Sequence, residues 1–290
     1  MNAKIIFLVT EDWYFLSHRL PVARAARDAG FEVVVATRVT SGAEAVKREG
    51  FRLVALNAFK REKTGPFHLL SEVREIARLY RREKPDIVHH VAIKPTVLGA
   101  LAARIAGVRG VVSAITGLGF VFGSSRLSAR LLRPLMIAGL RMGLRRGRII
   151  TQNQDDANAL IELGLAKPGQ MAVIRGSGVD PTYFQALPDP GVPFTVALVA
   201  RMLWDKGVRE VVGAARALRA QGATVRVLLA GSPDPANPNS VPVRQLEQWH
   251  RDGEVVYLGR VDDVREVWRQ AHVAILPSYY REGLPKSLLE

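Results

Sequence analysis

Two pairs of charged residues in the second half of the sequence could together bind a phosphorylated carbohydrate. Arg201 and Lys206 follow an apolar segment and come directly before Gly207 and a helix-like segment. Arginine can bind two phosphate oxygens at once, lysine adds a compact positive charge, and a helix N-terminus offers backbone N–H groups to an anion. Glu282 and Glu290 follow a later apolar segment. Because a carboxylate accepts hydrogen bonds from neighbouring hydroxyl groups, these two residues could hold a sugar.

Each pair also has a simpler interpretation when it is taken alone. Glutamates at this spacing are common on solvated helix faces, and Arg201 and Lys206 could lie in a solvated loop. The setting favours a binding site, because both pairs follow a predicted strand. The sequence has no Asp-x-Asp metal motif, since Asp155–Asp156 and Asp262–Asp263 are adjacent pairs. We therefore expect no metal and no cofactor.

Short apolar segments alternate with helix-like segments through the first part of the chain. The predicted strands there are Lys4–Val9, Glu32–Ala36, Leu53–Leu56, Asp86–His89 and Gly110–Ala114. The longer predicted helices are Phe15–Ala29, Pro66 or Phe67 to Glu83, and Pro95–Ala106. This alternation indicates βαβ units and a parallel sheet with helices on both faces. Ligands of such sheets bind beyond the carboxyl ends of the strands, so the loops there are candidate sites.

A second αβ region follows a segment rich in proline and glycine. Pro188, Pro190, Gly191 and Pro193 mark a linker, which places a domain boundary near residue 190. The remaining predicted strands are Arg148–Thr151, Met171–Ile174, Thr195–Ala200, Thr224–Ala230, Val255–Leu258 and His272–Leu276. The predicted fold class is therefore α/β, with one domain over residues 1–190 and another over residues 191–290.

Composition limits the partners and the compartment. The net charge of +14 favours an anionic partner, such as nucleic acid, anionic lipid headgroups or a phosphorylated substrate. The absence of cysteine excludes disulfides and thiolate metal sites, and is compatible with a cytosolic protein. The sequence contains no apolar run of about 18 residues, so no transmembrane helix is predicted. Glu11 and Asp12 follow the first strand without a signal-peptide cleavage pattern.

Loops after the strands of the first domain contain further residues that could contact a ligand. The loop with His18 and Arg19 lacks the G-x-G-x-x-G pattern of dinucleotide enzymes, and these side chains could equally be solvated at a helix start. In the extended segment before Lys94, adjacent histidines point to opposite faces, and we favour His90 as the one that faces a cleft. A core histidine and a surface lysine are the alternative. Glycines in the next loop allow a close approach of the backbone to a ligand, at Gly117 and Gly119.

The segment Arg126–Arg148 is rich in arginine and contains no acidic residue. On a helical wheel the arginines gather on one arc, and apolar side chains such as Leu131 and Met142 lie beside them. A basic amphipathic helix of this kind can lie at an anionic membrane surface, with a kink or a new helix at Pro134. An ordinary helix that packs on the sheet with its arginines in water is the alternative.

Three motifs resemble those of one enzyme family. Glu282 and Glu290 match the Glu-x7-Glu motif of retaining, nucleotide-sugar-dependent glycosyltransferases of family 4. Arg201 and Lys206 resemble the Arg-x4-Lys-Gly signature of the same family, and Ser17–Pro21 resembles a recurrent opening of its bacterial members. The chain looks most like bacterial transferases that add N-acetylgalactosamine or a similar sugar to undecaprenyl-diphosphate-linked saccharides.

The resemblance implies the GT-B fold, in which two Rossmann-like parallel-sheet domains face a cleft. The first domain would bind the acceptor and the second the nucleotide-sugar donor. Arg201 and Lys206 would neutralise the departing diphosphate in place of a metal ion. Glu290 would hold the ribose hydroxyls, and Glu282 with the turn at Gly283–Leu284 would position the donor sugar. The first domain would contact the acceptor or the donor through His18, Arg19, His90, Lys94, Gly117 and Gly119.

By the same resemblance we expect a retaining, metal-independent enzyme of surface polysaccharide synthesis. Its donor would be UDP-N-acetylhexosamine or UDP-hexose, and its acceptor a glycan, either lipid-linked or of another kind. It would be cytoplasmic and peripheral on the inner face of the membrane, attached through Arg126–Arg148. A full donor domain of this family would continue beyond Glu290, so we expect the second domain to be incomplete.

Two other functions remain open. The first is a non-catalytic fragment that binds a nucleotide sugar or an anionic lipid. The second is a nucleic-acid-binding protein, motivated by the positive charge. Aromatic residues are only 7% of the chain and lie among predicted core positions, which argues against base stacking in a basic groove. We therefore expect no nucleic acid partner.

Overall fold

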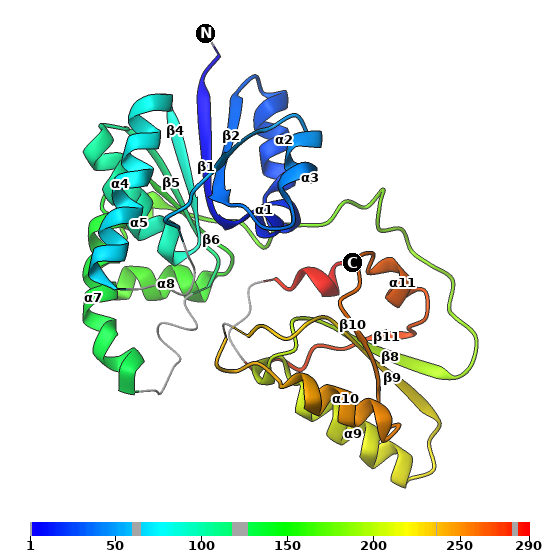
Figure 1. Ribbon diagram of the computed structural model, residues 1–290. Coiled ribbons are helices and arrows are strands. Elements are labelled where there is room, and N and C mark those ends of the chain that lie inside the picture. Colours follow the sequence, from blue (N-terminus) through cyan, green and yellow to red (C-terminus); the bar gives the residue numbers. More distant parts are fainter. Residues whose placement is uncertain (1, 60–64, 118–126, 236, 280–283) are drawn as a thin grey trace. The chain divides into compact units, whose positions relative to one another are not determined.

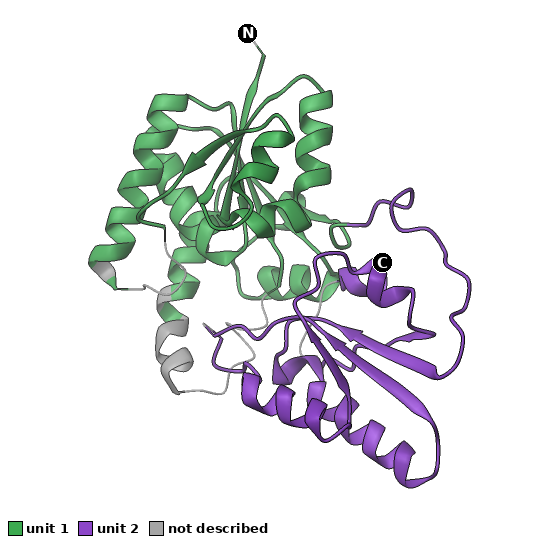
Figure 2. Ribbon diagram, turned by 45° about the vertical axis from the view of Figure 1, so that its right-hand side comes forward, with its two compact units in different colours: residues 1–177 green, residues 178–290 purple. Residues whose placement is uncertain are grey.

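The computed structural model describes residues 2–59, 65–117, 127–235, 237–279 and 284–290 (Figure 1). The chain divides into two compact units, residues 1–177 and residues 178–290 (Figure 2). Each unit contains a parallel β-sheet with α-helices packed on both faces. This confirms the predicted α/β class.

The sheet of unit 1 has seven strands in the order β3-β2-β1-β4-β5-β6-β7, and every neighbouring pair is parallel. The strands are β1 (Lys4–Glu11), β2 (Glu32–Arg38), β3 (Arg52–Ala55), β4 (Ile87–Val91), β5 (Gly110–Ile115), β6 (Arg148–Thr151) and β7 (Met171–Val173). Successive side chains of a strand point to opposite faces. Ile6 and Leu8 of β1 therefore enter one core cluster, and Phe7 and Val9 enter another.

Helices cover both faces of this sheet. They are α1 (Asp12–His18), α2 (Leu20–Asp28), α3 (Ala43–Arg48), α4 (Pro66–Glu83), α5 (Ile93–Ala106), α7 (Leu127–Leu144) and α8 (Gln154–Glu162). The core side chains show that α4 and α5 pack on one face of β1, while α1, α2 and α3 pack on the other. The predicted single helix Phe15–Ala29 is in fact broken at Arg19, which has φ −126°. Pro21 explains the break, because proline has no N–H group and suits the first turn of a new helix.

Unit 2 contains a four-stranded parallel sheet in the order β10-β9-β8-β11. The strands are β8 (Phe194–Val199), β9 (Val225–Ala230), β10 (Val256–Gly259) and β11 (Val273–Ala274). One face packs against α9 (Val208–Ala220) and α10 (Val243–Arg251), and the other packs against α11 (Arg265–Trp268). The sequence did not predict α10, because this helix of nine residues fully buries only Leu246 and Trp249.

The boundary between the units lies at residues 177–178, ahead of the boundary predicted near residue 190. The residues just after this boundary pack on α11 of unit 2, where the guanidinium carbon of Arg265 lies 3.8 Å from the centre of the Tyr183 ring. Proline marks where the chain leaves regular helix and strand, and this does not coincide with the place where its packing partners change. The division by packing therefore differs from the boundary near residue 190, which stays a prediction.

Candidate functional site

Arg201 and Lys206 lie in the loop that joins β8 to α9, which we call the cation loop (residues 200–207). The loop contains a 3₁₀ turn, η2 (Trp204–Lys206), and ends at Gly207. Gly207 has φ 75°, a conformation that favours glycine, and α9 begins at the next residue. Both cations therefore precede a helix N-terminus at the carboxyl end of a parallel strand, where anions are commonly bound.

A second loop holds the cation loop in place. This clamp loop (residues 231–235 and 237–242) follows β9, the sheet neighbour of β8. The N–H of Met202 donates to the carbonyl of Ser232 at 3.0 Å, and the N–H of Val241 donates to the carbonyl of Met202 at 2.9 Å. The N–H of Trp204 donates to the carbonyl of Asn239 at 2.9 Å. Main-chain hydrogen bonds thus fix the cation loop on both sides of Leu203.

Two polar side chains of the clamp loop bind side chains of the cation loop. Asp234 accepts a hydrogen bond from Nη1 of Arg201 at 2.8 Å. The side-chain amide of Asn239 donates to both carboxylate oxygens of Asp205, at 3.0 and 2.8 Å. The Arg201 side chain is still 48% exposed, so it can reach a ligand. Sequence reasoning missed Asp234 and Asn239; their signal was a polar loop at the end of the strand next to β8.

The cation loop also contacts the segment that leads to Glu282. The hydroxyl of Ser278 donates to the main-chain carbonyl of Asp205 at 3.0 Å, and the N–H of Tyr279 donates to the same oxygen at 3.3 Å. A Cβ atom on Gly207 would lie 2.3 Å from the carbonyl oxygen of Pro277. The cation loop and the described segment Pro277–Tyr279 therefore contact each other directly.

Of the two predicted acidic residues, Glu290 is described by the structure. Glu282 and Gly283 lie outside the described residues, and Leu284 is exposed. The helix expected after Gly283 is a 3₁₀ turn, η3 (Lys286–Leu288), in the described residues. Nζ of Lys286 lies 3.4 Å from Oε1 of Glu290, whose side chain is only 9% exposed. Burial raises the pKa of the Glu290 carboxyl, and Lys286 opposes this shift.

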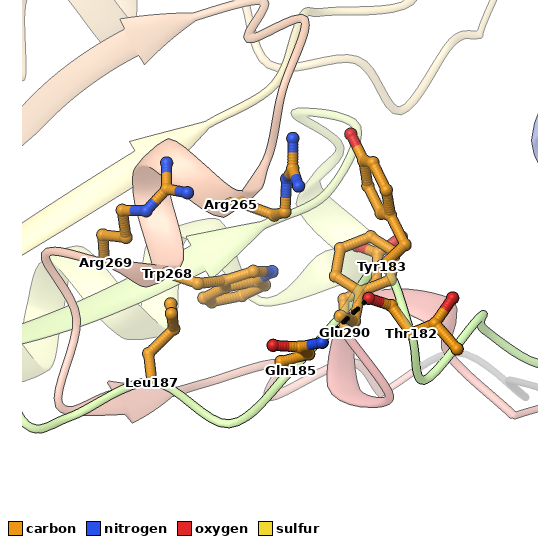
Figure 3. Close-up of a pocket in the computed structure, with 9 residues that line it drawn as sticks. Thr182, Tyr183, Gln185, Leu187, Arg265, Trp268, Arg269 and Glu290 are labelled. Carbon is orange, nitrogen blue, oxygen red and sulfur yellow. Dashed lines mark hydrogen bonds between the residues drawn. The ribbon is translucent and has the colours of Figure 1, made fainter.

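Glu290 lines a cavity of about 200 Å³ within unit 2 (Figure 3). Arg265 and Trp268 of α11 line it with Arg269, which follows the helix, together with residues 182–185 and Leu187. Figure 3 shows the Tyr183 ring beside Arg265, and Trp268 between Leu187 and Gln185. Among the described residues that line this cavity there is neither Arg201 nor Lys206. The structure therefore joins the cation loop to the segment before Glu282, and it places Glu290 with other partners.

The structure corrects the prediction for His90. This side chain is fully buried between α4 and α5, where the Tyr80 hydroxyl lies 3.1 Å from its Nε2. A Cβ atom on Gly99 would lie 2.6 Å from the ring, which shows how closely α5 packs on it. Burial lowers the pKa of His90 to about 3, so the imidazole is neutral. His90 is a core residue, the alternative that the sequence left open.

Lys94 forms an ion pair at the start of α5. Its Nζ lies 2.8 Å from Oε1 of Glu72, which is completely buried on α4. Its Nζ also lies 5.3 Å from the centre of the Phe59 ring. Lys94 therefore compensates a buried carboxylate, and 23% of its side chain remains exposed.

His18 and Arg19 lie at the junction of α1 and α2. The His18 ring stacks on that of Tyr14, with centroids 4.3 Å apart. Arg19 is only 6% exposed, and burial lowers the pKa of its guanidinium from the ordinary value, although Tyr14 opposes this shift. Arg19 is therefore not the solvated residue that was the alternative from sequence.

Of the two predicted loop glycines, Gly117 is described and Gly119 lies outside the described residues. Gly117 has φ 150°, and a Cβ atom placed there would meet no heavy atom of the described residues within 4 Å. Space for a close approach is therefore present at Gly117.

The basic segment forms α7 over the described residues, with Pro134 inside the helix. Leu140 and Leu144 are buried, and Gly139 packs against Val97 of α5. Ala138, Arg141, Met142 and Arg145 are exposed, so cationic and apolar side chains share one open face. Arg126 lies outside the described residues.

The described residues contain no candidate membrane-spanning helix and no candidate metal site. None of the helices in the described residues is both long and apolar enough to cross a membrane. Within the same described residues, no group of three or more His, Cys, Asp or Glu side chains could hold a metal ion.

Comparisons with known proteins identify the family of this chain. A family profile described as "Glycosyl transferase 4-like" matches residues 4–154, and one described as "Glycosyl transferases group 1" matches residues 193–290. The chain is 27% identical over 95% of its length to a Campylobacter jejuni N,N'-diacetylbacillosaminyl-diphospho-undecaprenol alpha-1,3-N-acetylgalactosaminyltransferase, covering 76% of that protein. It is 25% identical over 77% of its length to an Escherichia coli UDP-Gal:alpha-D-GlcNAc-diphosphoundecaprenol alpha-1,3-galactosyltransferase, covering 60% of that protein.

Solved structures show the same fold. Anabaena HepE in complex with UDP and glucose aligns with a TM-score of 0.70 and 17% identity, over 95% of this chain and 74% of that one. Sucrose-phosphate synthase from Thermosynechococcus elongatus aligns with a TM-score of 0.72 and 17% identity, over 97% of this chain and 76% of that one. These likenesses confirm the predicted GT-B fold. Because the first profile spans more than half of the sequence, the protein belongs to the glycosyl transferase 4-like family and is a glycosyltransferase.

Proposed function

We propose that the protein transfers a sugar from a UDP-sugar to a glycan linked to polyprenyl diphosphate. The C. jejuni and E. coli relatives act on undecaprenol-diphosphate-linked substrates by name, and one of them uses UDP-Gal. The observation that carries the proposal is the contact of the cation loop with the segment Pro277–Tyr279, since it brings phosphate-binding groups to the segment that leads to Glu282. A hexose or an N-acetylhexosamine is the proposed sugar.

Arg201 and Lys206 stabilise the leaving group in this proposal. During transfer the bond from the sugar C1 to the diphosphate oxygen breaks, and a bond from C1 to the acceptor hydroxyl oxygen forms. The hydroxyl proton passes to the departing UDP. Negative charge grows on the diphosphate as the bond breaks, and two cations near the α9 N-terminus lower the energy of that state. They take the role that a metal ion fills in other transferases.

The remaining roles follow from the family resemblance and remain proposals. Glu282 positions the donor sugar together with the turn at Gly283 and Leu284, and Glu290 holds the ribose. Attack occurs on the same face that the leaving group departs from, so the anomeric configuration is retained. NMR of the product tests this, because an inverted anomeric centre would exclude the retaining mechanism.

Replacement of Arg201 tests the proposal directly. The variant Arg201→Ala should release UDP from a UDP-sugar roughly 100-fold more slowly in the presence of a polyprenyl-diphosphate-linked acceptor. Arg244→Ala on α10 is the matched control, since Arg244 is exposed and its loss changes the net charge equally. Unchanged turnover in Arg201→Ala would remove the proposed role of this residue.

We also propose that α7 attaches the enzyme to an anionic membrane surface. The exposed Arg141 and Arg145 flank Met142, a combination that suits the boundary between lipid headgroups and acyl chains. Co-sedimentation with phosphatidylglycerol vesicles should be lost in Arg141→Glu/Arg145→Glu. It should persist in Arg244→Glu/Arg251→Glu, which makes the same change of charge on α10. Binding to DNA without binding to vesicles would instead favour a nucleic-acid partner.

A further inference from the structure

The sheet of unit 1 has a topological switch point between β1 and β4. These strands are parallel neighbours, with Phe7 opposite His89. The chain leaves β1 for α1, on the face that holds Phe7, and it leaves β4 for α5, on the opposite face. In open parallel sheets, ligands bind beyond the carboxyl ends of two strands whose connections leave in opposite directions. Arg19 follows α1, and His89 lies on β4.

Within the described part of the chain, Arg19 is a buried cation that has no counter-ion. Arg19 is 6% exposed, and its buried Nε atom has no hydrogen-bond partner among the described residues. Among the described residues, no hydrogen bond or ion pair involves the Arg19 guanidinium. The buried acid nearby in sequence, Asp12, is already bonded to the N–H groups of Trp13, Thr40 and Gly42. A buried charge destabilises the fold unless an opposite charge or hydrogen bonds compensate it.

His89 adds a second unsatisfied polar group on the face of the sheet that packs against α1, beside Phe7. It is 5% exposed, its ring centroid lies 5.0 Å from that of Phe7, and its buried Nε2 has no hydrogen-bond partner. Burial and, to a smaller extent, the charge of Arg19 together lower the pKa of His89 to about 3. The imidazole is therefore neutral and adds no charge that would need an acid. An anion with several oxygen acceptors would satisfy both residues.

We infer that Arg19 and His89 form a phosphate-binding site at the β1–β4 switch point. The guanidinium donates hydrogen bonds to phosphate oxygens and supplies the positive charge, and the neutral imidazole donates one further hydrogen bond. This deepens the proposed function and rests on it for the source of the phosphate. Both proposed substrates carry a diphosphate, the UDP-sugar donor and the polyprenyl-linked acceptor.

Calorimetry with three phosphate compounds tests the site in the folded protein. The probes are inorganic pyrophosphate, UDP and farnesyl diphosphate. Arg19→Gln should bind pyrophosphate at least about 10-fold more weakly than the wild type, which corresponds to the loss of one charge-assisted contact. Arg24→Gln on α2 is the matched control, since Arg24 is exposed and pairs with Glu49. The affinity of this variant for pyrophosphate should stay within about twofold of that of the wild type. Equal affinity of Arg19→Gln and the wild type for pyrophosphate would overturn the inference.

The other two probes identify the source. A larger loss for farnesyl diphosphate than for UDP assigns the site to the acceptor, and the reverse result assigns it to the donor. Binding is measured without turnover, so a protein that fails the Arg201 test of transfer can still show the Arg19 site. Conversely, an active transferase whose Arg19→Gln variant binds all three probes normally retains the proposed function and loses this inference.

A measurement on the wild type covers the case in which Arg19→Gln does not fold. The imidazole signals of His89 can be followed by NMR, with the assignment taken from His89→Gln. Saturating pyrophosphate should shift these signals, because a bound anion changes the charge and the hydrogen bonding beside the ring. A purely structural Arg19 would leave them unmoved, and that result would overturn the site.

Discussion

The side-chain amide of Asn239 donates two hydrogen bonds to the carboxylate of Asp205, at 3.0 and 2.8 Å. The two residues come from neighbouring loops at the carboxyl ends of β8 and β9. Asp205 lies within the turn that ends at Lys206. The orientation of a proposed phosphate-binding lysine therefore depends on an uncharged residue that no charge pattern would identify.

Replacement of Asn239 should weaken donor binding. In Asn239→Asp two carboxylates face each other, and the lost hydrogen bonds to a charged partner contribute about 1.5–3 kcal/mol. We expect the KM for the UDP-sugar to rise about 10-fold or more, since a factor of ten corresponds to about 1.4 kcal/mol. The exposed Asn158 on α8 offers a control in Asn158→Asp. An unchanged KM in Asn239→Asp would show that the turn keeps its shape without this contact.

Gly207 should tolerate no side chain. Its φ of 75° is unfavourable for other residues, and an added Cβ atom would lie 2.3 Å from the carbonyl oxygen of Pro277. Gly207→Ala should therefore separate the cation loop from the segment before Glu282 and strongly reduce UDP affinity in calorimetry. Gly213→Ala on α9 is the control, because a Cβ atom there meets nothing within 4 Å. It should stabilise the protein by roughly 0.5–1 kcal/mol.

Lys94 should matter for stability through Glu72. The variant Lys94→Met removes the lysine from a fully buried carboxylate that keeps His68 Nε2 at 3.4 Å, and we expect the free energy of unfolding to fall by about 3 kcal/mol. The double variant Lys94→Met/Glu72→Gln should recover much of that loss in a denaturant titration. Lys47→Met, which removes an exposed ion pair with Glu44, should cost less than about 1 kcal/mol. Equal losses in the two lysine variants would contradict this account.

Glu83 predicts a pH dependence of stability. Its carboxylate binds Arg52, Arg82 and Lys4, and these contacts lower its pKa from 4.5 to about 2. Because the folded protein holds this proton less tightly than the unfolded chain, the stabilisation is complete above about pH 4.5 and is lost as the pH falls towards 2. The free energy of unfolding of Glu83→Gln at pH 7 should be lower than that of the wild type by on the order of 2 kcal/mol.

The same experiment carries its own check. The difference between Glu83→Gln and the wild type should shrink steadily between pH 4.5 and pH 2 in urea titrations. Arg52→Met removes the main partner and should show a similar loss at pH 7, with little further effect in the double variant. A difference that stays constant down to pH 2 would exclude Glu83 as its source.

The sequence predicted those parts of the fold and site that depend on local order. A strand followed by charged residues, a glycine and a helix is a local pattern, so the position of Arg201 and Lys206 before α9 could be predicted. The helix Pro66–Glu83 matches its predicted range because a proline begins it and Lys84, with φ 48°, ends it before Pro85. These signals lie within a few residues of what they determine.

Features that depend on packing between distant segments could not be predicted in this way. Two adjacent histidines must face opposite sides of β4, but alternation does not show which side is open. In the structure both faces are covered, so His89 and His90 are both buried. The role of Asn239 depends in the same way on β8 and β9 being neighbours, which the order of the residues does not state.

The carbonyl oxygen of Asp205 accepts from both Ser278 and Tyr279, and it belongs to the main chain. Every amino acid carries this oxygen, so substitution at position 205 cannot delete the acceptor. Randomising position 205 should therefore separate two tasks of one residue. Variants that lose the side-chain hydrogen bonds from Asn239 would still keep the main-chain contact between the cation loop and the segment Pro277–Tyr279. A library at this position could therefore vary donor affinity while that contact stays in place.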